Sequence, residues 1–274
     1  MSRLQKAAGL FCLCAIGGGG HLRGDPLDHW HQRNPLPVTT LLASVAYGNG
    51  TFLALGLNGN VTTSTDGTNW VTYNMALTNA GYGGSVAFGN GQFVAVTGWT
   101  NIWTTPDGVT WQSQGVDMGV PFNGGPGRIV YAQGLFVAIG AQGLMMTSPD
   151  GLQWNVQRIG QSVDLADVTY GNGIFVVVGS SIQSGDSVFT SPDGSTWMAE
   201  DSGDAKHLGS IAFGNGQFVA VDTRAATGFS KVSYVFTSPD GHTWTSQDPP
   251  ALGPNVSWGC IVFLNGPFLA AGYF

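Results

Sequence analysis

The residues that could do chemistry are few, and most of the acids recur in one motif. Five aspartates stand in the pattern S/T-x-D-G-x-x-W, written TSPDGLQW at 147–154. An acid that returns at intervals of roughly 40 residues is typical of a repeat architecture and is not expected of a unique catalyst. The aspartates are Asp66, Asp107, Asp150, Asp193 and Asp240, and the tryptophans that follow them are Trp70, Trp111, Trp154, Trp197 and Trp244.

The motif has a structural interpretation. An Asp side chain can accept hydrogen bonds from backbone N–H groups of its own turn. The Gly after it supplies a positive φ angle, and the Trp can pack back over the turn and against a neighbouring unit. We therefore predict that these aspartates close turns and take no part in catalysis.

A second signature precedes each motif and defines the elements that position it. SVAYGNGTFLALG begins at Ser44, and related segments begin at residues 85, 128, 167, 210 and 260. In the first unit we expect strands at 44–48, 51–57, 61–65 and 69–74, with Asn49-Gly50 as a two-residue hairpin turn. Four antiparallel strands in about 40 residues make the size of a β-propeller blade. The predicted fold class is an all-β propeller of four-stranded antiparallel blades.

The number of blades follows from the number of units. Five units are complete, and a sixth, starting at Cys260, has two strands and no turn motif. Residues 28–34 align with the strand after the motif, with Trp30 in the position of Trp154. They are expected to form the outer strand of the last blade. We predict six blades, the last one split between the termini and incomplete; a chain truncated from a larger propeller is the alternative.

The repeated motif resembles the Asp-box of the bacterial neuraminidase repeat propellers. The units also resemble secreted bacterial repeat propellers and, more distantly, the photosystem II assembly factor propellers. The resemblance covers roughly residues 28–274. It implies a propeller fold, with the box on the turn between the third and fourth strands and on the face away from an active site. It says little about activity.

The sialidase activity of part of that family implies three arginines, a Tyr–Glu pair and an Asp acid. The only glutamate here is Glu200, on an expected outer strand. Arginines and loop aspartates that the family chemistry would need are present without its motifs. We expect no enzyme, and a divergent or degraded sialidase-like glycoside hydrolase remains the alternative. The arginines and loop aspartates that such a hydrolase could use are Arg128, Arg158, Arg224, Asp164, Asp167, Asp186 and Asp222.

Binding is expected on the loops between the second and third strands and on the loops between blades, because function on a repeat scaffold concentrates in loops of variable length. The longest are 222–234, 180–187 and 114–127. The ligand-binding hypothesis names Arg224, Phe229 and Lys231 in the first loop, and Trp99 and Asn101 elsewhere. A second hypothesis pairs Arg128 with Asp167, at the start of successive first strands, as an ion pair lining the channel. For every one of these residues a purely structural role is the alternative.

Composition excludes several other functions. With a net charge of -7 and no cluster of cations, neither nucleic acid nor an anionic membrane is an expected partner. The cysteines and histidines lack metal-ligand spacing, so we expect no metal and no cofactor. Arg3 and Lys6 precede the apolar run Ala7–Ile16, a pattern typical of a secretion signal and too short to span a membrane.

The sequence therefore predicts a leader at 1–24, a signal peptide or a disordered segment, and a single propeller domain at 25–274. The protein is expected to be secreted or periplasmic. Its predicted function is a non-catalytic binding or interaction scaffold for a glycan or a protein, with carbohydrate as one ligand class.

Overall fold

The structure is a computed structural model of the 274-residue chain. It describes residues 12–16, 42–56, 59–74, 84–97, 101–116, 126–160, 163–181, 187–203, 207–222, 234–247, 257–264 and 266–273.

The named elements of the described residues are all strands, and these residues contain no α-helix. Accordingly, the described part of the chain has no helix of the length and apolarity needed to cross a membrane. The chain divides into two compact units, residues 20–165 and residues 166–274 with 1–19, where the sequence predicts a single domain.

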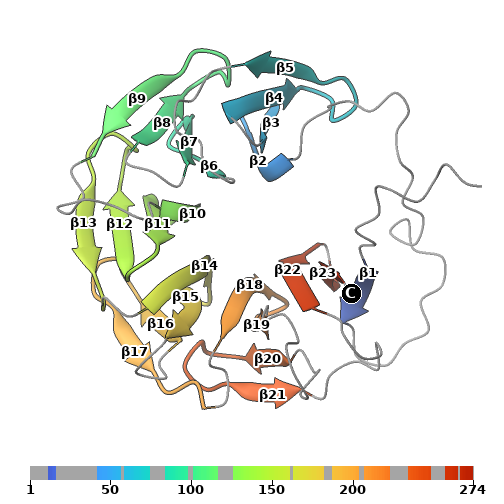
Figure 1. The fold of residues 1–274 in the computed structure, drawn as a ribbon, viewed down its shortest axis with the longest axis vertical. Coiled ribbons are helices and arrows are strands. Elements are labelled where there is room, and N and C mark those ends of the chain that lie inside the picture. Colours follow the sequence, from blue (N-terminus) through green and yellow to red (C-terminus); the bar gives the residue numbers. More distant parts are fainter. Residues whose placement is uncertain are drawn as a thin grey trace, which may run out of the picture. The chain divides into compact units, whose positions relative to one another are not determined.

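The 20–165 unit contains three four-stranded sheets, in which each strand pairs antiparallel with the next along the chain. In Figure 1 the strands of each sheet follow one another in sequence order. The sheets are β2 (Leu42–Gly48), β3 (Thr51–Gly56), β4 (Asn60–Ser64) and β5 (Val71–Asn74); β6 (Ser85–Gly89), β7 (Gln92–Val96), β8 (Asn101–Thr105) and β9 (Gln112–Gly115); and β10 (Pro126–Ala132), β11 (Leu135–Gly140), β12 (Leu144–Ser148) and β13 (Asn155–Arg158).

The 166–274 unit contains two more sheets of this kind and one of three strands. Its first strand, β14, begins just before the boundary between the units. The sheets are β14 (Val163–Gly171), β15 (Ile174–Ser181), β16 (Val188–Ser191) and β17 (Met198–Glu200); β18 (Leu208–Gly214), β19 (Gln217–Asp222), β20 (Val235–Ser238) and β21 (Thr245–Gln247); and β22 (Ser257–Phe263), β23 (Phe268–Tyr273) and β1 (Cys12–Ile16).

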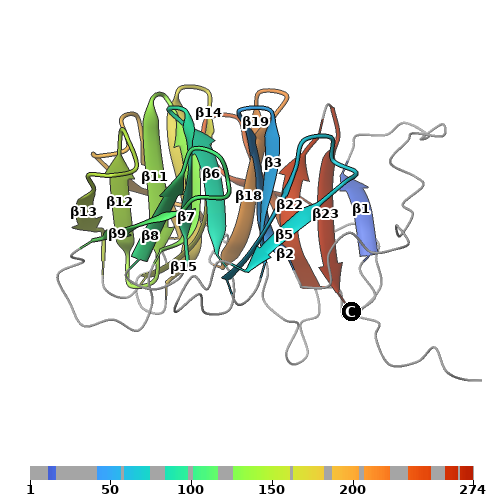
Figure 2. The ribbon, with the colours of Figure 1, turned by 90° about the horizontal axis from the view of Figure 1, so that it is seen from above.

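The three-stranded sheet joins the two ends of the chain. β23 lies between β22 and β1, and β1 pairs antiparallel with it from Cys12, opposite Gly272, to Ile16, opposite Phe268 (Figure 2). This matches the prediction of an incomplete last sheet with strands from both termini. β1, the third strand of this sheet, is part of the apolar run that the sequence assigns to a secretion signal. An apolar run can pair as a strand as readily as it can serve as the hydrophobic part of a signal. Residues 28–34 lie outside the described residues.

The first hairpin of each four-stranded sheet has the expected turn. Asn49 and Gly50 have φ angles of 47° and 74°, so both central residues are left-handed, as a type I′ turn requires. The same pair of positive angles occurs at 90–91, 133–134, 172–173 and 215–216. In the third sheet Gln133 takes the place of Asn, at φ 52°.

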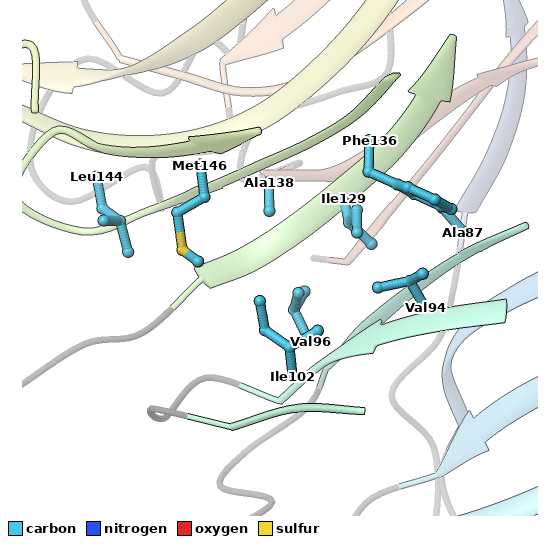
Figure 3. Packing of buried hydrophobic residues seen from close by; sticks show 9 residues of the cluster. All are labelled: Ala87, Val94, Val96, Ile102, Ile129, Phe136, Ala138, Leu144 and Met146. Carbon is cyan, nitrogen blue, oxygen red and sulfur yellow. The ribbon is translucent and has the colours of Figure 1, made fainter. Parts of the chain in front are cut away.

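The core lies between consecutive sheets. In the 20–165 unit, side chains of β6–β9 and β10–β13 point toward one another and form a dry cluster (Figure 3). Val94, Phe136 and Met146 are each 0% exposed there. Because β7 has consecutive apolar residues, it supplies one face to the preceding sheet and the other to the following one. Similar clusters join β2–β5 to β6–β9, β14–β17 to β18–β21, and β18–β21 to β22–β23.

Candidate functional site

Each repeated aspartate lies in the turn between the third and fourth strands of its sheet and closes that turn. Asp150 Oδ1 accepts the backbone N–H groups of Leu152 (2.8 Å) and Gln153 (3.0 Å). It also accepts the hydroxyl of Ser148 (3.0 Å), whose oxygen in turn accepts the N–H of Gly151 (2.7 Å). The same four contacts recur around the other four aspartates, Asp66, Asp107, Asp193 and Asp240.

The contacts also set the charge of these carboxyl groups. In each turn the backbone N–H three residues later is the largest cause that holds the pKa of the aspartate below its usual range. A carboxylate that accepts several N–H donors is stabilised in its charged form. At neutral pH these groups are therefore ionised acceptors and cannot donate a proton as general acids.

The glycine and tryptophan of the motif attach the turn to the rest of the protein. Trp154 Nε1 donates to the carbonyl of Gly151 at 3.0 Å, and the ring packs against the cluster between β6–β9 and β10–β13. A Cβ atom on Gly151 would stand 2.6 Å from Val94 of the preceding sheet. The side-chain amide of Gln92, also in that sheet, donates to the carbonyl of Asp150. The motif thus holds its own turn and a junction between sheets.

A second repeated set of residues also joins sheets. Near the start of the first strands, Ser44 accepts the N–H of Val86 (3.2 Å), and Ser85 accepts that of Ile129 (3.3 Å). In the other unit Ser210 accepts the N–H of Ile261 at 3.1 Å. Each acceptor bonds the residue just after its counterpart in the next sheet. We call the aligned set the first-strand row: Ser44, Ser85, Arg128, Asp167, Ser210 and Cys260.

Asp167 fills the acceptor position of this row with a carboxylate. Its Oδ2 accepts the hydroxyl of Ser210 (2.8 Å) and the N–H of Ile211 (3.0 Å), and its Oδ1 accepts the N–H of Val168 (2.9 Å). Arg128 is exposed and lies in the other unit, so its pairing with Asp167 stays a prediction.

Most of the predicted loop residues are not described. Trp99, Arg224, Phe229 and Lys231 lie outside the described residues. Asn101 begins β8, where its backbone pairs with Gly115 of β9. The base of the longest predicted loop is described, because the N–H of Asp222 donates to the carbonyl of Tyr234 at 3.0 Å.

Three residues of the hydrolase alternative have local contacts. Glu200 Oε1 accepts the hydroxyl of Thr190 (2.5 Å) and lies 2.8 Å from His242 Nδ1 in the turn of the next sheet. Arg158 donates to the carbonyl of Gln142 (3.0 Å), and Asp164 accepts the backbone N–H of Gln142 (3.1 Å). Within the described ranges, no three His, Cys, Asp or Glu residues gather as a metal site would need.

Sequence reasoning missed His207, which joins a polar group at the edge where the second strands end and the third strands begin. Ser180 Oγ lies 2.9 Å from His207 Nδ1, and the two residues form an isolated antiparallel bridge. Asp222 ends β19 on the sheet that follows, and it is only 4% exposed. His207 belongs to no motif, so only its position before a first strand could have indicated it.

Comparison with known proteins identifies the fold. Neither a family model nor a curated protein matches the sequence. Among solved structures, the chain is similar to YCF48 bound to a D1 peptide, at 16% identity and a TM-score of 0.56, over 86% of this chain and 94% of that one. It is also similar to YCF48 from Cyanidioschyzon merolae, at 12% identity and a TM-score of 0.53, over 86% and 96%.

A third similar structure is the GH74 enzyme of Niastella koreensis, at 15% identity and a TM-score of 0.54, over 84% of this chain and 36% of that one. The fold is a β-propeller. At these identities the likeness extends to the fold alone.

Proposed function

We propose that this propeller is a secreted, non-catalytic scaffold that binds carbohydrate at the edge where the second strands end. The observation that carries the proposal is how the repeated acids are used. Each turn aspartate is ionised and accepts hydrogen bonds within its own turn, so the motif supplies stability and leaves ligand contacts to the other edge of the sheets.

The connections at that other edge support the proposal. β11 and β12 are joined by the short turn 141–143, in which Leu144 donates to the carbonyl of Ala141. At the same edge β15 and β16 are joined by residues 182–187, and β19 and β20 by residues 223–234. A constant sheet with connections of variable length is the usual arrangement for recognition on a repeat scaffold.

Secretion is the second part of the proposal. Arg3 and Lys6 before the apolar run Ala7–Ile16 are typical of an export signal. The structure pairs the second half of this run, Cys12–Ile16, with β23, so the proposal is export of a chain that keeps this strand. A scaffold outside the cytoplasm would meet the glycans of envelopes and matrices. Polar loops on a rigid fold are suited to binding such ligands.

A glycoside hydrolase is the alternative, and the likeness to the GH74 enzyme is what favours it. Hydrolysis needs two carboxyl groups on either side of the scissile bond. Glu200 is bonded to Thr190 and His242, and Asp164 holds a turn, which leaves these two acids committed to structural contacts.

A binding assay paired with a turnover assay tests the proposal. The purified protein is applied to an array of neutral and sialylated oligosaccharides, to an array of peptides, and separately to chromogenic glycosides. We expect glycan binding without product release. Binding to peptides alone would replace carbohydrate by a protein partner, a class suggested by the peptide-bound YCF48 structure. Sustained hydrolysis would overturn the non-catalytic assignment in favour of the hydrolase.

A further inference from the structure

The junction between β14–β17 and β18–β21 ends, at the edge opposite the turn motif, in polar side chains. Below this edge the junction is apolar, with Val178, Val188 and Ala220 each 0% exposed in one cluster. Side chains alternate between the two faces of a strand, so Ser180 and Asp222 follow Val178 and Ala220 on the faces that meet. Both polar residues therefore continue this junction to its edge.

His207 and Tyr234 complete the group. His207 Nδ1 lies 2.9 Å from the hydroxyl of Ser180 and thus joins the two sheets. Tyr234 is opposite Asp222, whose N–H it accepts at 3.0 Å. Directly opposed residues place their Cβ atoms roughly 5 Å apart on one face. Tyr234 is 36% exposed, whereas Asp222 is 4% exposed.

The corresponding positions of other sheets are different in chemistry. In β10–β13 the residue that ends the second strand is Gly140, and Leu144 begins the third. In β2–β5 these positions hold Gly56 and Asn60. A carboxylate with an aromatic ring opposite it is therefore a property of the β18–β21 sheet and not of the repeat.

We infer that Ser180, His207, Asp222 and Tyr234 form the floor of a binding site for a neutral sugar. An exposed aromatic face packs against the C–H face of a pyranose ring. A carboxylate accepts hydrogen bonds from sugar hydroxyls, while the imidazole and the serine hydroxyl can both donate and accept. None of the four residues is an arginine or lysine that would pair with the carboxylate of an anionic sugar, so a neutral sugar is the class that fits the group. This inference rests on the proposed function and assigns its site and its sugar class.

The test compares the wild type with Tyr234→Ala, His207→Gln and Asp222→Asn. The probes are immobilised cellohexaose, mannohexaose, chitohexaose and 3′-sialyllactose, followed by calorimetric titration with the neutral probe that binds best. Tyr47→Ala is the matched control for the aromatic residue, because Tyr47 is 58% exposed on another sheet. Asp201→Asn is the control for the acid, since Asp201 is exposed in the same unit.

We expect each of the three site variants to weaken the affinity for the neutral probe at least tenfold, and both controls to stay within twofold of the wild type. If Asp222→Asn does not fold, Tyr234→Phe decides the matter together with Tyr234→Ala, because phenylalanine retains the ring contact with Phe236 and should bind the neutral probe within a few-fold of the wild type. Neutral-sugar binding that all three folded variants retain would refute this site and leave the proposed function standing. A preference for 3′-sialyllactose would refute the sugar class. No binding to any of the four probes would refute both.

Discussion

The ring of Phe88 lies directly over the backbone of Gly48, so that a Cβ atom built on Gly48 would stand 2.0 Å from Phe88 Cγ. Gly48 ends the first strand of one sheet, and Phe88 comes from the first strand of the next. The same relationship joins Gly89 to Tyr131, Gly171 to Phe213 and Gly214 to Phe263. At four junctions between sheets, the ring of the next sheet thus occupies the space that a side chain on the glycine would fill.

Substitution of this glycine should destabilise the protein for a steric reason alone. Gly89 lacks a positive φ angle, so Gly89→Ala creates no backbone strain and only overpacks the ring of Tyr131. We expect a loss of about 1–3 kcal/mol in the free energy of unfolding, measured by urea denaturation. Gly115→Ala is the control, because nothing lies within 4 Å of its added Cβ. Equal stability of the two variants would contradict the packing argument.

Removal of one turn carboxylate should weaken one turn. Asp150→Ala deletes the acceptor of two backbone N–H groups and of the Ser148 hydroxyl. Because the turn is partly open to water, which replaces some of these bonds, we expect a cost of about 1–2 kcal/mol. Asp150→Asn retains an acceptor oxygen and should lose less. An alanine variant as stable as the wild type in thermal denaturation would show that the turn closes without its carboxylate.

The pH dependence of stability follows from the same carboxylates. Their pKa values are lower in the folded protein than the ordinary 3.8, so the folded state favours the ionised form. That contribution is complete above the unfolded pKa and is lost as pH falls through the folded pKa. Between pH 7 and about pH 5 these groups should leave the urea concentration at the unfolding midpoint unchanged. At pH values lower than about 4 that urea concentration should decrease. A midpoint that rises on acidification below pH 4 would refute this.

Loss of a serine in the first-strand row should loosen two junctions at once. Ser210 donates to Asp167 and accepts the N–H of Ile261, and it is 5% exposed. Ser210→Ala leaves both partners without that bond, and the expected cost is about 1–3 kcal/mol. Ser113→Ala, on an exposed strand position, serves as the control and should change stability by less than about 0.5 kcal/mol. Amide hydrogen exchange at Ile261 should accelerate in the first variant only.

Local geometry explains what was predictable from sequence. The turn at 147–154 closes through contacts between residues two and three apart, so its residue types alone indicate its structure. The hairpin at Asn49-Gly50 follows for the same reason, since its residues adopt left-handed angles. Repetition of these local signals fixed the four-stranded units and the propeller class.

Contacts between distant segments explain what was not predictable. The fit of Phe88 over Gly48 depends on how two sheets pack, and no spacing within one unit encodes it. β1 (Cys12–Ile16) pairs with β23 at the other end of the chain. The apolar run that contains β1, interpreted alone, suggests a leader. The Ser180–His207 contact joins two consecutive sheets, and His207 belongs to no repeated motif, so the repeat pattern does not reveal the contact.

The glycine-and-aromatic junction also bears on how such a chain can change its length. At four junctions the same small residue contacts the same kind of ring. A duplicated four-stranded repeat would therefore find suitable partners in the sheets on both sides of it. Unequal recombination within the gene could then add or delete a whole unit without a new interface having to evolve. The residues at the edge where the second strands end already differ from sheet to sheet, and they would be free to diversify afterwards.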